Sequence, residues 1–138
     1  MSIKLSLHHI GLVARNFDVM ANWYQQVLGF ELIKQWEMPE IQPGVRMAFL
    51  KYGSFILELL GDGEKLGHRV ALDPLEDYQI TGYRHIAFAV DDVDRLIAGL
   101  EAKGASIFFP PYTFDVPNIR ASLVRDPEGN TIEFMKRL

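Results

Sequence analysis

Residues 8–30 read HHIGLVARNFDVMANWYQQVLGF, and residues 84–105 read RHIAFAVDDVDRLIAGLEAKGA. The two stretches share an order more than they share identical residues. Each has a histidine and an isoleucine, then a short apolar run, a polar break, a helical pattern and a glycine. An internal repeat of this kind predicts that one supersecondary unit occurs twice. We therefore expect residues 1–138 to form a single domain made of two similar modules.

Each module is predicted to contain one strand, one helix and then three more strands, which is an α+β fold. Alternating apolar and β-branched residues indicate the strands. Helical spacing of apolar residues follows Asn16 and Asp92, which are candidate N-caps. The predicted strands cover residues 5–14, 31–37, 46–52 and 55–60 in the first module, and begin at His85 and cover 106–109, 121–125 and 131–135 in the second. The modules span about residues 4–60 and 83–138, and a linker covers 61–82.

The composition is that of a globular protein. Apolar residues make up 49% of the 138 residues and charged residues 23%, which supports a core and excludes general disorder. The absence of cysteine excludes disulfides, cysteine-ligated zinc and thiol catalysis. A net charge of −4 argues against nucleic acid and anionic membranes as partners. With no long apolar run and no signal-peptide pattern, a cytoplasmic protein with a small-molecule substrate is expected.

One histidine opens each module and one glutamate closes it. His9 and His85 are predicted on the first strand of their modules, where the neighbours on the same face are small or medium-sized. Glu58 in FILELL and Glu133 in TIEFM each stand between apolar residues. Simple alternation explains one such glutamate as facing solvent. The repeated arrangement favours convergence of all four side chains, if the two sheets face each other.

Two imidazoles and two carboxylates form a ligand set suited to Zn, Ni, Co, Mn or Fe(II). Four protein ligands leave positions open on a six-coordinate ion, where a metal can polarise a substrate carbonyl. We expect Glu133 or Glu58 to act catalytically by moving a proton between adjacent carbons.

Other side chains are candidates for contact with a substrate. Arginines at equivalent strand positions can bind a carboxylate, although surface placement is the alternative interpretation, and aromatic side chains can line a pocket. The predicted substrate-binding residues are Arg46, Arg120, Trp36, Phe49 and Tyr112. His8 alternates with His9 along the predicted strand, so we expect it on the opposite face.

Five stretches carry a resemblance to a known family: HHIGLVARN, WYQQVLGFEL, FILEL, RHIAFAVDDVD and RDPEGNTIEF. They resemble the vicinal oxygen chelate superfamily, which includes glyoxalase I, methylmalonyl-CoA epimerase, extradiol dioxygenases and bleomycin- or fosfomycin-resistance proteins. The resemblance spans nearly the whole chain and implies two βαβββ modules that form an incomplete barrel around a metal. Carried over position by position, it implies the metal ligands His9, Glu58, His85 and Glu133, a set most similar to that of glyoxalase I.

The resemblance implies a metal-dependent lyase or isomerase that acts on a small vicinal-oxygen substrate through a metal-bound enediolate. Glutathione is disfavoured, because Val13 stands where glyoxalase I commonly has arginine, and Asp62 where it commonly has asparagine. Two other functions stay open. One is an Fe(II) extradiol dioxygenase using His9, His85 and Glu133, and the other is a non-catalytic drug-binding resistance protein. The resemblance also implies a homodimer, with the ligands supplied by one chain or by two.

Overall fold

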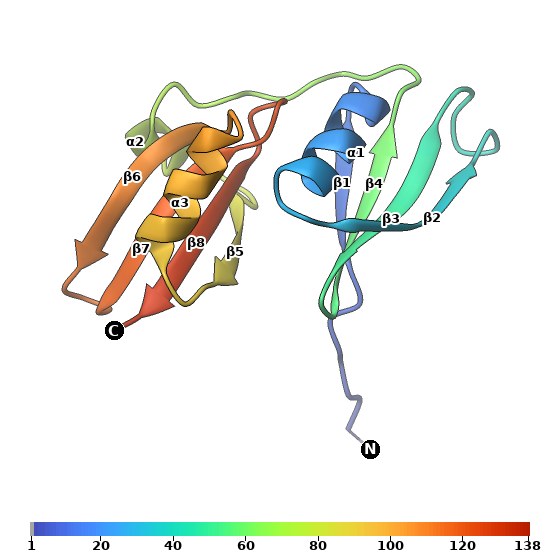
Figure 1. Ribbon diagram of the computed structural model, residues 1–138. Coiled ribbons are helices and arrows are strands. Elements are labelled where there is room, and N and C mark those ends of the chain that lie inside the picture. The colour runs from blue at the N-terminus through green and yellow to red at the C-terminus, as the bar shows by residue number, and fades with distance from the viewer. Residues whose placement is uncertain (1) are drawn as a thin grey trace. The chain divides into compact units, whose positions relative to one another are not determined.

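The computed structural model describes residues 2–138 and divides them into two units, of which the first ends at Gly67 and the second begins at His68 (Figure 1). Each unit contains a four-stranded mixed sheet and a ten-residue helix. The same strand order occurs in both sheets, which confirms the predicted α+β fold of two βαβββ modules. No helix among these residues is long and apolar enough to cross a membrane.

The first unit contains β1 (Ile10–Ala14), α1 (Phe17–Gln26), β2 (Glu31–Glu37), β3 (Arg46–Tyr52) and β4 (Phe55–Gly61). Its strands lie in the order β1-β4-β3-β2. β1 runs parallel to β4, whereas β3 is antiparallel to both of its neighbours. This order places the first strand of the module beside the last, which brings the histidine-bearing and glutamate-bearing segments together.

Helix α1 begins where the sequence predicts. Asn16 has an extended backbone, and its side chain accepts a hydrogen bond from the Val19 N–H at 3.1 Å. After the helix, the chain turns through Gly29, whose φ of +81° suits glycine. The buried side of α1 is formed by Phe17, Met20, Ala21 and Tyr24. Apolar residues of β3 and β4 on the α1 side complete this core: Ala48, Leu50, Leu57 and Leu59.

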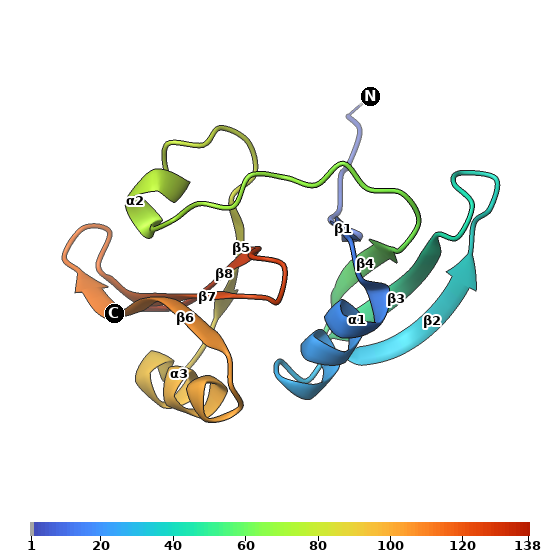
Figure 2. The same cartoon turned by 90° about the horizontal axis from the view of Figure 1, so that it is seen from above.

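The second unit contains α2 (Pro74–Asp77), β5 (His85–Ala89), α3 (Val93–Ala102), β6 (Ser106–Phe114), β7 (Ile119–Arg125) and β8 (Thr131–Arg137). Its strand order is β5-β8-β7-β6, with β5 parallel to β8. Asp92 caps α3 by accepting a hydrogen bond from the Arg95 N–H at 3.0 Å. Figure 2 shows α2 and α3 on opposite faces of this sheet. One face is therefore covered by α3, and α2 lies over part of the other.

The predicted linker is partly ordered structure in the second unit. It includes α2, and the buried Asp77 carboxylate forms an ion pair with Arg84 at 2.6 Å. The Arg125 guanidinium donates a hydrogen bond to the Ala71 carbonyl. These contacts attach the segment from Ala71 to Arg84 to its own unit.

The first strand is shorter than predicted. Regular pairing begins at Ile10, opposite Leu57, and β4 itself begins only at Phe55. Counting back along this register, residues 2–7 extend past the end of β4. Their alternating apolar side chains are exposed, so the alternation in the sequence does not correspond to a paired strand there.

The second strand of the second module is longer than predicted, because it continues through Pro110 and Pro111 to Phe114. β6 is an edge strand, so it pairs along one side only, and neither proline has a register partner on β7. Its register against β7 shifts between Phe109 and Tyr112. The buried Ser122 hydroxyl donates a hydrogen bond to the Phe109 carbonyl at 2.6 Å, which satisfies an acceptor at the irregularity.

Candidate functional site

In the first unit, His9 and Glu58 lie side by side. His9 directly precedes β1, and Glu58 stands in the middle of β4. The His9 Nε2 and Glu58 Oε2 atoms are 3.6 Å apart, and the two side chains are 35% and 20% exposed. Glu58 is opposite Gly11 on β1, and a Cβ placed on Gly11 meets no atom within 4 Å. The pair therefore lies beside open space on the sheet face opposite α1.

His8 is close to His9, which corrects the expectation that the two rings point to opposite faces. Their Nδ1 atoms are 2.7 Å apart. Both residues precede β1, so the strict alternation of a paired strand does not apply to them. The Phe49 ring lies near both imidazoles, with centroids 6.1 Å from His9 and 6.3 Å from His8. The adjacency of the two histidines in the sequence is the signal from which this contact could have been predicted.

The second unit contains the equivalent pair. His85 is the first residue of β5 and Glu133 lies on β8. The His85 Nε2 and Glu133 Oε2 atoms are 2.9 Å apart. Glu133 is opposite Ala87, just as Glu58 is opposite Gly11. The His85 Nδ1 atom is buried without a hydrogen-bond partner in the described structure.

Aromatic side chains share the sheet faces of these two pairs. Glu58 is opposite Phe49 on β3, and the Phe49 and Trp36 rings are in edge contact at 4.9 Å. In the second unit, Glu133 is opposite Leu123, which is itself paired with Phe109. The Tyr112 and Phe114 rings continue this aromatic surface along β6 at 4.9 Å from each other. Each His–Glu pair therefore has apolar rings on its own face.

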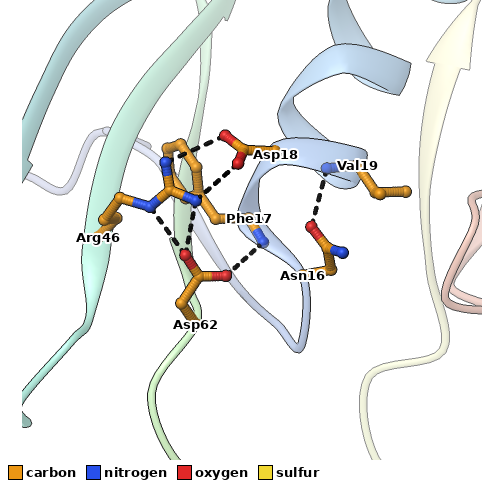
Figure 3. A network of polar contacts seen from close by, with 6 residues as sticks. All are labelled: Asn16, Phe17, Asp18, Val19, Arg46 and Asp62. Atoms are coloured by element: carbon orange, nitrogen blue, oxygen red, sulfur yellow. Dashed lines mark hydrogen bonds and ion pairs between the residues drawn. The ribbon is translucent and has the colours of Figure 1, made fainter.

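Arg46 lies on the other face of the first sheet, toward α1. Its guanidinium contacts the carboxylates of Asp18 at 3.0 Å and Asp62 at 2.6 Å (Figure 3). It also lies over the Phe17 ring, 4.5 Å from the centroid. Hydrogen bonds from Asp18 and Asp62 raise the pKa of Arg46 above its usual range. Because its guanidinium is paired with these two carboxylates, Arg46 joins α1 to the sheet and does not face a substrate on the side of the His9–Glu58 pair.

Asp62 completes this network from the end of β4. Its carboxylate accepts a hydrogen bond from the Phe17 N–H at 3.0 Å, at the first residue of α1 (Figure 3). That hydrogen bond, followed by those from Arg46, lowers the pKa of Asp62 below its usual range. The negative charge that the sequence suggested as a repellent for glutathione is thus paired with Arg46.

Arg120 takes the corresponding position in the second unit. Its guanidinium contacts Asp94 on α3, with one N–O distance of 2.6 Å, and donates to the Thr113 hydroxyl at 2.9 Å. The hydrogen bond from Arg120 lowers the pKa of Asp94. The expectation that Arg46 and Arg120 bind substrate is therefore replaced by a structural role, because both lie on the helix-covered faces.

Within residues 2–138, no group of three or more His, Asp or Glu side chains is assembled in a form that could hold a metal ion. What the structure brings together is two pairs, one in each unit, each with one imidazole and one carboxylate. A sequence profile of the Glyoxalase/Bleomycin resistance protein/Dioxygenase superfamily matches residues 6–134. The chain belongs to this superfamily. The match includes both His–Glu pairs.

The comparisons also show relatives within this superfamily. A lactoylglutathione lyase of Haemophilus influenzae is 28% identical over 96% of this chain and 93% of its own length. A lactoylglutathione lyase of Arabidopsis thaliana is 25% identical over 94% of this chain, which spans only 43% of that longer protein. The crystal structure of a glyoxalase family protein from Enterococcus faecalis has a TM-score of 0.78 and 27% identity, covering 94% of this chain and 96% of its own. These likenesses confirm the superfamily and fold expected from the sequence.

Proposed function

We propose that this superfamily member is a divalent-metal-dependent lyase or isomerase of the glyoxalase I type. Its substrate is a small molecule with oxygens on adjacent carbons. The observation that carries the proposal is the duplication of the His–Glu pair: His9 with Glu58, and His85 with Glu133. The lactoylglutathione lyases among its relatives support the reaction class.

The four side chains fit a divalent metal by their chemistry and by the spacing within each pair. Imidazole nitrogen and carboxylate oxygen bind Zn and similar ions at about 2.0–2.2 Å. The imidazole nitrogen and the carboxylate oxygen are 3.6 Å apart in the first pair and 2.9 Å apart in the second, so both atoms of a pair are close enough to bind the same ion. We propose that each pair supplies one imidazole and one carboxylate ligand to a divalent ion.

A bound metal would supply Lewis-acid polarisation of the paired substrate oxygens. Glu133 or Glu58 moves the proton between the adjacent carbons, since each carboxylate is partly buried and lies next to its histidine. Trp36 and Phe49 on the face of the first pair, and Tyr112 on the face of the second, supply apolar surface for the substrate.

The structure changes the argument about glutathione. Asp62 is paired with Arg46 on the α1 side, away from the face of the His9–Glu58 pair, so it does not face an anionic substrate there. Val13, which is 59% exposed, still provides no cation for a glutathione carboxylate. We therefore propose a hemithioacetal or related α-oxo substrate held mainly by apolar contacts.

The test is isomerisation of the hemithioacetal of methylglyoxal by the metal-loaded protein, measured with glutathione and with an uncharged thiol. Activity with the uncharged thiol, lost in Glu133→Gln and retained in Glu101→Gln, would support the proposal. Glu101 is an exposed glutamate on α3 and serves as the matched control. No isomerisation with either thiol, together with no bound metal, would overturn it.

A further inference from the structure

The contact between the His8 and His9 rings restricts where their protons lie. Their Nδ1 atoms are 2.7 Å apart, a hydrogen-bond distance. A neutral imidazole has one N–H and one acceptor nitrogen. Two Nδ1 atoms can therefore share a hydrogen bond only if one ring carries its proton on Nδ1 and the other does not.

The Glu58 side of His9 indicates which ring is the donor. The His9 Nε2 lies 3.6 Å from the Glu58 Oε2, which is too long for a hydrogen bond. This nitrogen is the one that faces the carboxylate, and it must present a lone pair to bind a metal. A neutral His9 with a free Nε2 carries its proton on Nδ1, which points at His8.

We propose that His8 is a positioning residue for the metal site: its Nδ1 accepts the His9 Nδ1–H, which fixes the tautomer and ring orientation that present His9 Nε2 to the metal. This inference rests on the proposed function. Metal-binding histidines generally donate their second N–H to a neighbouring acceptor, and loss of that acceptor weakens metal binding. Phe49 supports the arrangement, because its ring packs near both imidazoles.

The second unit has no equivalent of the hydrogen bond between His8 and His9. The residue before His85 is Arg84, which has no acceptor nitrogen and is paired with Asp77 at 2.6 Å. The His85 Nδ1 atom is buried without a partner among the described residues. The distance from His85 Nε2 to Glu133 Oε2 is 2.9 Å, shorter than the 3.6 Å of the first pair. The two ligand pairs are therefore equivalent in position but differ in how the histidine is oriented.

Three variants separate the hydrogen bond from simple packing. His8→Phe keeps a ring beside Phe49 but removes the acceptor. His8→Asn restores an acceptor, since the Asn Oδ1 occupies nearly the place of the His Nδ1. His68→Phe is the control, because His68 is an exposed histidine far from His9 in the sequence and in the other unit.

The first readout uses the metal-free protein. Long-range ¹⁵N–¹H NMR at about pH 8.5, above the usual histidine titration range, reports which ring nitrogen is protonated. Wild type, His8→Asn and His68→Phe should show His9 protonated mainly on Nδ1, and His8→Phe should show a shift toward Nε2. Equal tautomer populations of His9 in wild type and His8→Phe would overturn the inference.

The second readout is the affinity for Zn²⁺, measured by competition with a chelating dye. His8→Phe should bind Zn²⁺ about 10- to 100-fold more weakly, whereas His8→Asn and His68→Phe should bind like wild type. If wild type binds no Zn²⁺, the proposed function fails, and the NMR result still decides the His8–His9 bond. If wild type binds Zn²⁺ and His8→Phe binds it equally well, the positioning role fails while the proposed function stands.

Discussion

The space beside Glu58 depends on one residue that has no side chain. Gly11 stands directly opposite Glu58, and an added Cβ at Gly11 would meet nothing within 4 Å. Gly11 is not among the glycines with positive φ, so its backbone does not require glycine. A strand glycine without a conformational reason costs stability relative to alanine. We interpret Gly11 as leaving room for the metal and substrate.

Substitutions at Gly11 should separate stability from binding. Gly11→Ala should raise the free energy of unfolding by about 0.5 kcal/mol, measured by urea denaturation. Gly11→Leu should also fold, but it should weaken Zn²⁺ binding about tenfold, equivalent to about 1.4 kcal/mol. Val13→Leu, on the same face of β1, is the control and should bind normally. Unchanged Zn²⁺ affinity in Gly11→Leu would show that this space is not part of the site.

At the level of elements, both units use one arginine to attach a helix to its sheet. Arg46 contacts Asp18 of α1 and Asp62 after β4, whereas Arg120 contacts Asp94 of α3. The first network has two carboxylates, a backbone N–H and an aromatic ring, so it should contribute more to stability than the second. Both arginines lie away from the His–Glu pairs, which leaves those faces free for ligands.

The network around Asp62 predicts a pH dependence of stability. The pKa of Asp62 is lowered on folding, so its contribution is present above the unfolded-state pKa of about 3.9 and is lost as the pH falls through the lower folded value. Asp62→Asn should lower the unfolding free energy at neutral pH by about 1 kcal/mol, a modest value because the side chain is 32% exposed.

Urea denaturation across acidic and neutral pH checks this expectation. The difference between wild type and Asp62→Asn should shrink as the pH falls through the acidic range. Asp91→Asn, at an exposed aspartate, is the control and should not change the profile. A pH-independent difference would mean that the Asp62 charge is not what stabilises the α1 attachment.

For the whole molecule, the sequence predicted the duplicated module because its signals are local. Apolar spacing, the caps at Asn16 and Asp92, and the recurring glycines are each read within a few residues. The errors concern the ends of strands, because the length of a strand is decided by its pairing partner and not by the local sequence. The alternation of apolar residues continues upstream of Ile10, but β4 begins only at Phe55 and has no residues opposite positions 2–7. The predicted strand over residues 106–109 stopped before Pro110 and Pro111, yet an edge strand accommodates both prolines.

The sequence likewise predicted one part of the candidate site and missed another. The sequence predicted that a histidine opens and a glutamate closes each module, and the structure places the two side chains of each module side by side. The roles of Arg46 and Arg120 could not be read from the sequence, because one step along a strand decides which face a side chain joins. The His8 contact was missed for a related reason, since it depends on β1 starting after His9.

The proposal that both His–Glu pairs are metal ligands makes a prediction about the whole chain. Zn²⁺ at about 100 times its Kd should stabilise wild type by about 2.7 kcal/mol for each ion bound. Glu58→Gln and Glu133→Gln should each reduce this stabilisation, because each removes a carboxylate that lies next to a histidine. Native mass spectrometry and thermal unfolding measure the ions bound and the stabilisation, with Glu101→Gln as the control. A glutamate variant that binds Zn²⁺ as wild type does would show that its pair is not a metal site.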